Sequence, residues 1–220
     1  MSIKENLQNI QAELPANVTL VAVSKTKPVE MIREAYEAGQ RDFGENYIQE
    51  LTEKQGQLPT DIKWHAIGHL QSNKVKYITS FVHLIHAVDS FRLLQEINKQ
   101  AQKNNRVIDC LLQIHIAREE TKFGFDFTEC ENMLSSEAFK ELHNIRITGL
   151  MGMASNTTDE LQVRNEFRSL KNIFEKFKIQ NSKFKILSMG MSSDHKIAIE
   201  EGSTMIRIGS SIFGERNYNQ

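Results

Sequence analysis

A lysine directly after an apolar run is the first candidate for chemistry in this chain. Lys25 follows the run 18–24, and by the alternation of a β-strand it shares a face with Val21 and Val23. An amine at a strand end can capture a carbonyl compound as a Schiff base. The alternative is a lysine that extends its charge into solvent from the end of the strand.

Arg207 is a second candidate, because it lies inside another apolar run, 204–208. A buried guanidinium is costly unless a counter-charge or an acceptor meets it. A carboxylate of the chain, for example Asp194 or Glu45, would give Arg207 a structural role. An acceptor on a ligand would make it a binding residue, and the sequence leaves both interpretations open.

Glycine and hydroxyl residues follow the last two apolar runs. The last run is followed by Gly209, Ser210 and Ser211. The preceding run, 185–189, is followed by the segment GMSSD, which contains Ser192 and Ser193. Backbone N–H groups beside a glycine, together with hydroxyls, suit a phosphate, as does the start of a helix. A serine that only caps the following helix is the alternative. Because two such turns occur in succession, we predict a phosphate site.

Eight short apolar runs alternate with helical patterns, as in an α/β fold. They predict a (β/α)8 TIM barrel, preceded by an N-terminal helix that begins at a capping box of Ser2 and Glu5. An open doubly wound sheet is the alternative, but no GxGxxG follows the first run. No linker interrupts the pattern, so we expect one domain over residues 1–220. The runs cover residues 18–24, 42–44, 63–67, 84–88, 107–116, 145–151, 185–189 and 204–208.

The barrel would bring these candidates together. Its first and last strands are neighbours, and chemistry in such barrels lies at the carboxyl ends of the strands. Lys25, Arg207 and the two turns would therefore share one mouth. A ligand with an aldehyde, a phosphate and a ring nitrogen fits this set, which points to pyridoxal 5′-phosphate (PLP).

Composition excludes several other classes of protein. The chain has 220 residues, with 27 Lys and Arg against 28 Asp and Glu, and no basic tract that would favour nucleic acid. No apolar run is long enough to span a membrane, and no signal peptide is recognisable. Two isolated cysteines, Cys110 and Cys130, fit a reducing cytoplasm. His65 and His69 have helical metal-ligand spacing, but Gly68 interrupts them and no HExxH is present, so we expect no metal.

Several longer motifs of the sequence are typical of one protein family. VAVSKTKP, DFGENYIQE, WHAIGHLQSNKVK, IHAVDS, EETKFGF, GLMGMA and GMSSDHKIAIEEGSTMIRIGSSIFGERNY resemble the pyridoxal-phosphate homeostasis proteins, the YggS/PROSC-like family. This family is similar to the barrel domain of bacterial alanine racemases. The resemblance implies a cytoplasmic barrel that acts in vitamin B6 and amino-acid homeostasis. The cofactor-binding residues it implies are Lys25, Asn46, Ser192, Arg207, Gly209 and Ser210.

The resemblance also implies a role for each of these residues. PLP would form an aldimine with Lys25 rather than Lys27, and Arg207 would face the pyridine nitrogen. Ser192 and the turn of Gly209 and Ser210 would hold the phosphate, and Asn46 would line the pocket. Lys122 could hold a substrate carboxylate or a second PLP, or be a solvated loop lysine.

Three function classes compete. The first is a non-catalytic PLP carrier, a monomer whose further partners would be apo forms of PLP-dependent enzymes, met transiently. The second is a PLP-dependent amino-acid racemase, and the third is a class I aldolase that forms a Schiff base with a sugar phosphate through Lys25. The aldolase lacks an obvious acid/base set beside Lys25.

A racemase needs an acid/base group on each face of its planar intermediate. In alanine racemases a tyrosine from a separate C-terminal domain serves the second face, and we expect this chain, which ends at Gln220, to lack that domain. Tyr36 and Tyr77 should face away from the mouth, and Tyr218 lies in the terminal segment. Tyr47 is the remaining substitute, although packing at a helix start would also explain it. We therefore favour the carrier.

Overall fold

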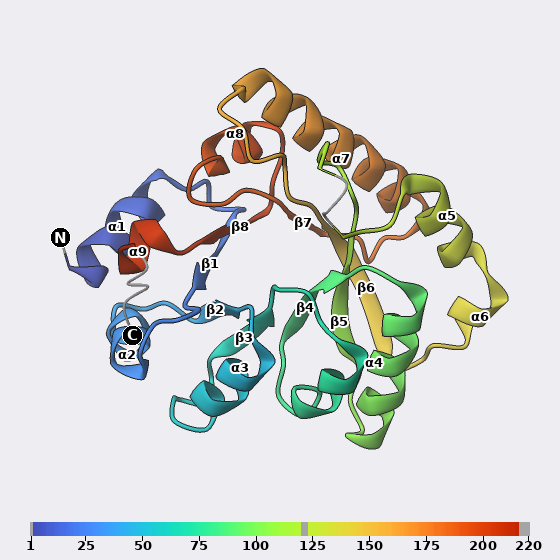
Figure 1. Cartoon of the computed structure of the whole chain (residues 1–220), viewed down its shortest axis with the longest axis horizontal. Helices are drawn as coiled ribbons and strands as arrows, with labels where there is room; N and C mark the ends of the chain where they lie inside the picture. Colours follow the sequence, from blue (N-terminus) through green and yellow to red (C-terminus); the bar gives the residue numbers. More distant parts are fainter. Residues whose placement is uncertain (1, 120–122, 216–220) are drawn as a thin grey trace.

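The computed structural model describes residues 2–119 and 123–215, and its centre is a closed barrel of parallel strands (Figure 1). Each strand pairs with the next along the chain, and β8 returns to pair with β1. This confirms the predicted (β/α)8 barrel. The strands are β1 Thr19–Val23, β2 Asp42–Glu45, β3 Lys63–Ala66, β4 Leu84–Val88, β5 Ile108–Gln113, β6 Ile145–Met151, β7 Ile186–Ser188 and β8 Met205–Ile208.

Helices surround the barrel and connect its strands (Figure 1). The predicted N-terminal helix is present and begins with a complete capping box, in which Ser2 and Glu5 each accept a backbone N–H of the other. A 3₁₀-helix, η1, follows β3 instead of an α-helix. The helices are α1 Ile3–Glu13, α2 Val29–Glu37, α3 Ile48–Gln55, η1 Ser72–Tyr77, α4 Phe91–Lys103, α5 Phe127–Ser135, α6 Glu137–Lys140, α7 Glu160–Gln180, α8 His195–Glu200 and α9 Ser210–Phe213.

Apolar side chains fill two separate layers. The larger layer lies between the strands and the helices and includes the fully buried Phe43, Phe167 and Phe174. The smaller layer fills the barrel lumen, where Val21 and Leu84 belong to one cluster of buried side chains. The barrel is therefore a packed core, and a ligand must bind at one of its ends.

The pairing of β1 with β8 brings the first and the last strands of the barrel side by side. Val21 is the register partner of Arg207, so the residues after β1 and β8 emerge at the same mouth. Nearby, α1 and α9 lie side by side, and the side-chain amide of Asn6 donates to the backbone oxygen of Ile212 at 3.0 Å (Figure 1). One side of the mouth is thus built from the segments that follow the first and the last strands of the barrel.

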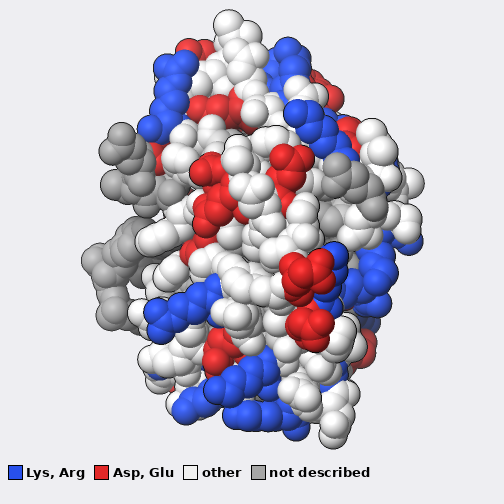
Figure 2. Space-filling view, turned by 90° about the vertical axis from the view of Figure 1, so that its right-hand side faces the viewer, with Lys and Arg blue, Asp and Glu red and all other residues white. Residues whose placement is uncertain are grey.

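The molecular surface mixes both signs of charge. Figure 2 shows Lys and Arg interspersed with Asp and Glu over the face that it presents, rather than a field of one sign. Among the described residues, no helix is long and apolar enough to cross a membrane.

Candidate functional site

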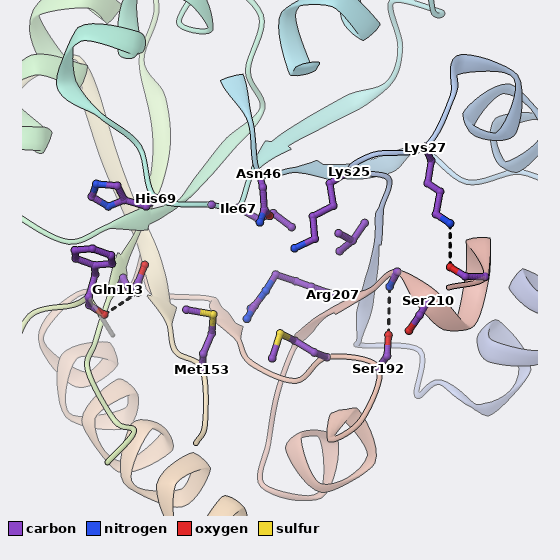
Figure 3. Close-up of a pocket in the computed structure, with 16 residues that line it drawn as sticks. Lys25, Lys27, Asn46, Ile67, His69, Gln113, Met153, Ser192, Arg207 and Ser210 are labelled. Carbon is purple, nitrogen blue, oxygen red and sulfur yellow. Dashed lines mark hydrogen bonds between the residues drawn. The ribbon is translucent and has the colours of Figure 1, made fainter. Parts of the chain in front are cut away.

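A cavity of about 320 Å³ opens at the carboxyl end of the strands (Figure 3). All six residues predicted for the site line it. The side chains of Lys25 and Arg207 extend toward the same central space. The lining residues are Val23, Lys25, Lys27, Asn46, Ile67, Gly68, His69, Gln113, Phe123, Met153, Met191, Ser192, Arg207, Gly209, Ser210 and Gly214.

The two lysines after β1 have different surroundings. The ammonium of Lys27 donates to the backbone oxygens of Phe213, Gly214 and Glu215 at 3.1, 3.0 and 2.8 Å, and so holds the end of α9. Between the lysines, Thr26 adopts a left-handed conformation with φ of 63°, which turns the chain sharply. Both lysines line the cavity, and Lys27 in addition holds the end of α9.

A buried polar cluster supports the turn that carries Lys25. Lys54 donates to the backbone oxygen of Ser24 at 2.7 Å and to Oε1 of Glu45 at 2.8 Å, and the Ser24 hydroxyl donates to the same carboxylate oxygen at 2.6 Å. Burial raises the pKa of Glu45 to about 7, although Lys54 and Ser24 favour its charged form. The other oxygen of Glu45 is buried without a hydrogen-bond partner.

Arg207 is almost fully buried and makes no ion pair within the described part of the chain. Its guanidinium donates to the hydroxyl of Ser188 at 2.7 Å and to the backbone oxygen of Gly152 at 3.4 Å. Burial lowers its pKa to about 10, which leaves it a cation at neutral pH. Neither carboxylate considered from the sequence pairs with it: Glu45 binds Lys54, and Asp194 accepts from the backbone N–H of Met191 in the turn before α8.

The two glycine-and-serine turns meet at the cavity. The backbone N–H of Gly209 donates to the hydroxyl of Ser192 at 3.4 Å, which joins the turn after β7 to the turn after β8 (Figure 3). Ser210 is the first residue of α9. Gly190, with φ of 98°, allows the first turn to reverse, and a Cβ there would lie only 2.6 Å from the Cβ of Ala198. The hydroxyl and backbone amide groups of both turns therefore line the same cavity.

The opposite wall contains residues that the sequence analysis missed. The rings of His69 and Phe123 stack with centroids 4.4 Å apart, and the amide of Gln113 donates to the backbone oxygen of Phe123 at 2.7 Å. Gly68, also missed, lies against the predicted Asn46, and a Cβ at Gly68 would approach the backbone oxygen of Asn46 to 2.8 Å. Gln113 was recognisable as a polar residue within the predicted run 107–116. His69 and Phe123 lie in loops, where no strand pattern marks them.

Other candidates from the sequence lie elsewhere. Tyr36 donates its hydroxyl to Asp61 on the outside of the barrel, and Tyr77 is half exposed. Tyr47 is 62% exposed and lines an adjoining groove rather than the cavity. Lys122 and Tyr218 lie outside the described residues.

The histidine pair with helical spacing is separated in the structure. His65 is buried inside the barrel, where it meets Asp42 and His86. His69 is on the cavity wall and contacts Asp89 at 2.9 Å. The two histidines therefore do not form a common ligand set.

The barrel and its mouth define a known class of domain. The alanine racemase, N-terminal domain, family matches residues 1–217 of the chain. The solved structure of PipY from Synechococcus elongatus, described as having PLP bound, is 36% identical with a TM-score of 0.88, and the match covers 97% of this chain and 100% of that one.

Curated relatives identify a family within this class of domain. The pyridoxal phosphate homeostasis protein of Aquifex aeolicus is 44% identical, over 90% of this chain and 87% of its own length. That of Vibrio alginolyticus is 37% identical, over 99% of both. The chain therefore belongs to the pyridoxal phosphate homeostasis protein family.

Proposed function

We propose that this chain is a PLP carrier, which holds the cofactor reversibly as an aldimine on Lys25 and acts in intracellular PLP and amino-acid homeostasis. It would act as one domain over residues 1–220, as a cytoplasmic monomer, and would release PLP to apo-enzymes in transient encounters. The observation that carries the proposal is the convergence of Lys25, Arg207 and the two serine turns on one cavity. The homeostasis relatives and PLP-bound PipY support it.

The chemistry of the cavity fits PLP. Three cationic side chains line it, those of Lys25, Lys27 and Arg207, and none of its described lining residues is an aspartate or a glutamate. An anion is thus favoured in this cavity by charge as well as by hydrogen bonding. When bound, PLP supplies an electrophilic aldehyde and a ring that can withdraw electrons.

Each residue would have a separate task. The amine of Lys25 would bind the aldehyde carbon, while the hydroxyls of Ser192 and Ser210 and the backbone N–H of Gly209 would hold the phosphate. Arg207 would face the ring nitrogen. Because arginine only donates hydrogen bonds, it would leave that nitrogen unprotonated. Asn46 would contribute a polar side chain to the wall of the cavity.

These residues favour a carrier over a racemase. An unprotonated ring withdraws electrons poorly, which disfavours removal of an α-proton. No tyrosine occurs among the described residues that line the cavity, so the tyrosine that serves the second face in alanine racemases has no counterpart in this part of the chain. Each such group typically contributes ~10²–10⁴-fold to a rate. We therefore expect α-proton exchange to be slower than in a racemase by at least that factor.

Two measurements on the same preparation test the proposal. Addition of PLP to the apoprotein should produce a visible absorption band that persists through gel filtration and disappears when an apo-enzyme that needs PLP is added. Incubation of the loaded protein with a panel of amino acids in deuterated water should give little exchange at the α-carbon. Exchange and inversion on the order of 1–10³ per second would establish the racemase instead. Absence of a visible band would contradict PLP binding through a lysine.

A further inference from the structure

A continuous chain of hydrogen bonds, which we call the file, runs through the barrel interior from Arg207 to the opposite end of the barrel. Arg207 Nη1 lies 2.7 Å from the hydroxyl of Ser188, and this hydroxyl lies 3.1 Å from Nδ1 of His86. Nε2 of His86 lies 2.9 Å from Nδ1 of His65, whose Nε2 lies 3.0 Å from the carboxylate of Asp42. Four consecutive contacts thus connect the cavity to the amino-terminal end of β2.

This file crosses the lumen beside the apolar cluster that fills it. Ser188 is on β7 and His86 on β4, strands that are separated in the barrel by β5 and β6, so their contact spans the interior. Both side chains and that of His65 are fully buried, beside a lumen cluster that includes Leu84. Buried polar groups in such a place need partners, and here each one finds its partners in the file.

The two ends of the file fix the direction of its hydrogen bonds. Arg207 can only donate, so the oxygen of Ser188 accepts. At the other end, burial raises the pKa of Asp42, but the hydrogen bond from His65 and the nearby positive charges outweigh it and hold the pKa below its ordinary value. Asp42 is therefore an ionised acceptor at neutral pH, and Nε2 of His65 must carry a proton.

The direction in the middle of the file depends on the protons of the two histidine rings. Burial lowers the pKa of His86 well below its ordinary value, so this ring is neutral. If Nδ1 of His65 carries no second proton, it accepts from the Nε2–H of His86, 2.9 Å away. The Nδ1 of His86 in turn accepts from the hydroxyl of Ser188. Every hydrogen bond consequently points from the guanidinium toward the carboxylate.

We propose that Ser188, His86, His65 and Asp42 are positioning residues for Arg207, forming a polarised relay that orients its guanidinium toward the cavity and extends the influence of the Asp42 carboxylate to it. The relay replaces the ion pair that Arg207 lacks in the described structure. The statement about Arg207 and a ligand rests on the proposed PLP site. The direction of the relay is a property of the protein itself and can be tested without PLP.

The contacts of Asp42 favour this role over a cation site. Asp42, His65 and His83 could in principle share a metal ion, because their ligand atoms lie within 4.8 Å of one another. However, the Asp42 carboxylate already accepts from Nε2 of His65, and the ammonium of Lys63 lies 3.9 Å from its other oxygen. A cation of the protein thus lies beside the carboxylate, where it would repel a metal ion.

Nitrogen NMR of ¹⁵N-histidine-labelled apoprotein tests the direction of the relay. Wild-type His65 and His86 should both be the tautomer protonated at Nε2, with assignments taken from single replacements of each histidine. Asp42→Asn replaces the carboxylate by an amide that can either accept or donate. The ring signals of His86 should therefore shift, although His86 does not touch residue 42. A wild-type His86 protonated at Nδ1 would overturn the proposal.

PLP titrations of the same proteins test the positioning role. Asp42→Asn should weaken PLP binding by about three- to tenfold, because the guanidinium loses the polarising carboxylate, and should shift the visible band. Asp109→Asn is the matched control. Asp109 lies on β5 and is bonded to Arg146 outside the relay, so its replacement should leave both the affinity and the band unchanged.

The outcomes separate the two proposals. If the wild type does not bind PLP, the proposed function fails, while the tautomers of His65 and His86 still decide the relay. If PLP binds and Asp42→Asn behaves as Asp109→Asn does, the positioning role is wrong. Should Asp42→Asn not fold, Ser188→Ala provides the same test. It removes the donor to Nδ1 of His86 and the acceptor of Arg207, so an unchanged Nδ1 signal of His86 together with unchanged PLP binding would contradict the relay.

Discussion

The ammonium of Lys54 lies 2.8 Å from Oε1 of Glu45, and both groups are buried directly beneath the turn that carries Lys25. Buried opposite charges seldom repay the cost of burial, and here one oxygen of Glu45 is still without a partner, although Lys54 also pairs with Glu50. The pair therefore holds the turn in place at a cost in stability, and that cost depends on pH.

The first prediction concerns this pH dependence. The pKa of Glu45 is raised from 4.5 to about 7 in the folded chain, so between these values the folded state holds a proton that the unfolded state has lost. The stability should fall as pH rises through this window, by at most about 1.4 kcal/mol per pH unit. Urea unfolding at several pH values should show this slope in the wild type and a smaller slope in Glu45→Gln.

Glu137→Gln is the control for that comparison. Glu137 is on the surface and pairs with Lys140, so its replacement should leave the wild-type slope intact. Equal slopes for all three proteins would show that Glu45 does not titrate in this range.

The second prediction assigns the Schiff-base lysine. Borohydride reduction of the PLP-loaded protein, followed by peptide mapping, should place the adduct on Lys25. Lys25→Ala should abolish both the adduct and the visible band. Lys27→Ala should retain an adduct on Lys25 but bind PLP more weakly, because it releases the end of α9. A reduced adduct on Lys27 would refute the assignment.

The third prediction concerns the ring nitrogen. A guanidinium that faces this atom can donate a hydrogen bond but does not give up a proton, since its pKa is about 10 even when buried. PLP labelled with ¹⁵N in the ring should give the chemical shift of an unprotonated pyridine in the wild-type protein at neutral pH. The shift of a protonated ring would argue against this role of Arg207.

The fourth prediction concerns the phosphate. Hydrogen bonds to charged groups are worth about 1.5–3 kcal/mol each, so pyridoxal, which lacks the phosphate, should bind about a hundredfold more weakly than PLP, or worse. Ser192→Ala should weaken PLP by about tenfold and leave pyridoxal unaffected. Ser193→Ala is the neighbouring control, because Ser193 does not line the cavity. Equal affinities for PLP and pyridoxal would exclude a phosphate site in these turns.

Most of the fold could be predicted from the sequence, because the apolar runs are short, regular and separated by strong helical patterns. The N-terminal helix followed from the capping box of Ser2 and Glu5, which needs only local chemistry. The 3₁₀-helix after β3 did not follow, because the local sequence does not distinguish it from an α-helix.

The site was predictable where the fold brings strand ends together. Lys25 and Arg207 are found at one mouth because β1 and β8 are neighbours in a closed barrel. The partner of Arg207 could not be predicted, because it comes from β7 and from a relay across the lumen rather than from a carboxylate. The contact of His86 with Ser188 depends on side-chain directions on β4, whose register shifts between Ile85 and Val88.

The three hydrogen bonds of Lys27 also constrain when the cavity can exist. They join residues 186 to 188 positions apart, and the strand that contains Arg207 is the last of the eight. A chain emerging from the ribosome therefore displays Lys25 long before it has Arg207 or the turn at Gly209. Because domains are synthesised from the N-terminus and fold as units, the complete lining of the cavity forms around Lys25 only after Gly214 has been added. Under the proposed function, PLP could therefore be captured only after the turn that follows β8 has been synthesised.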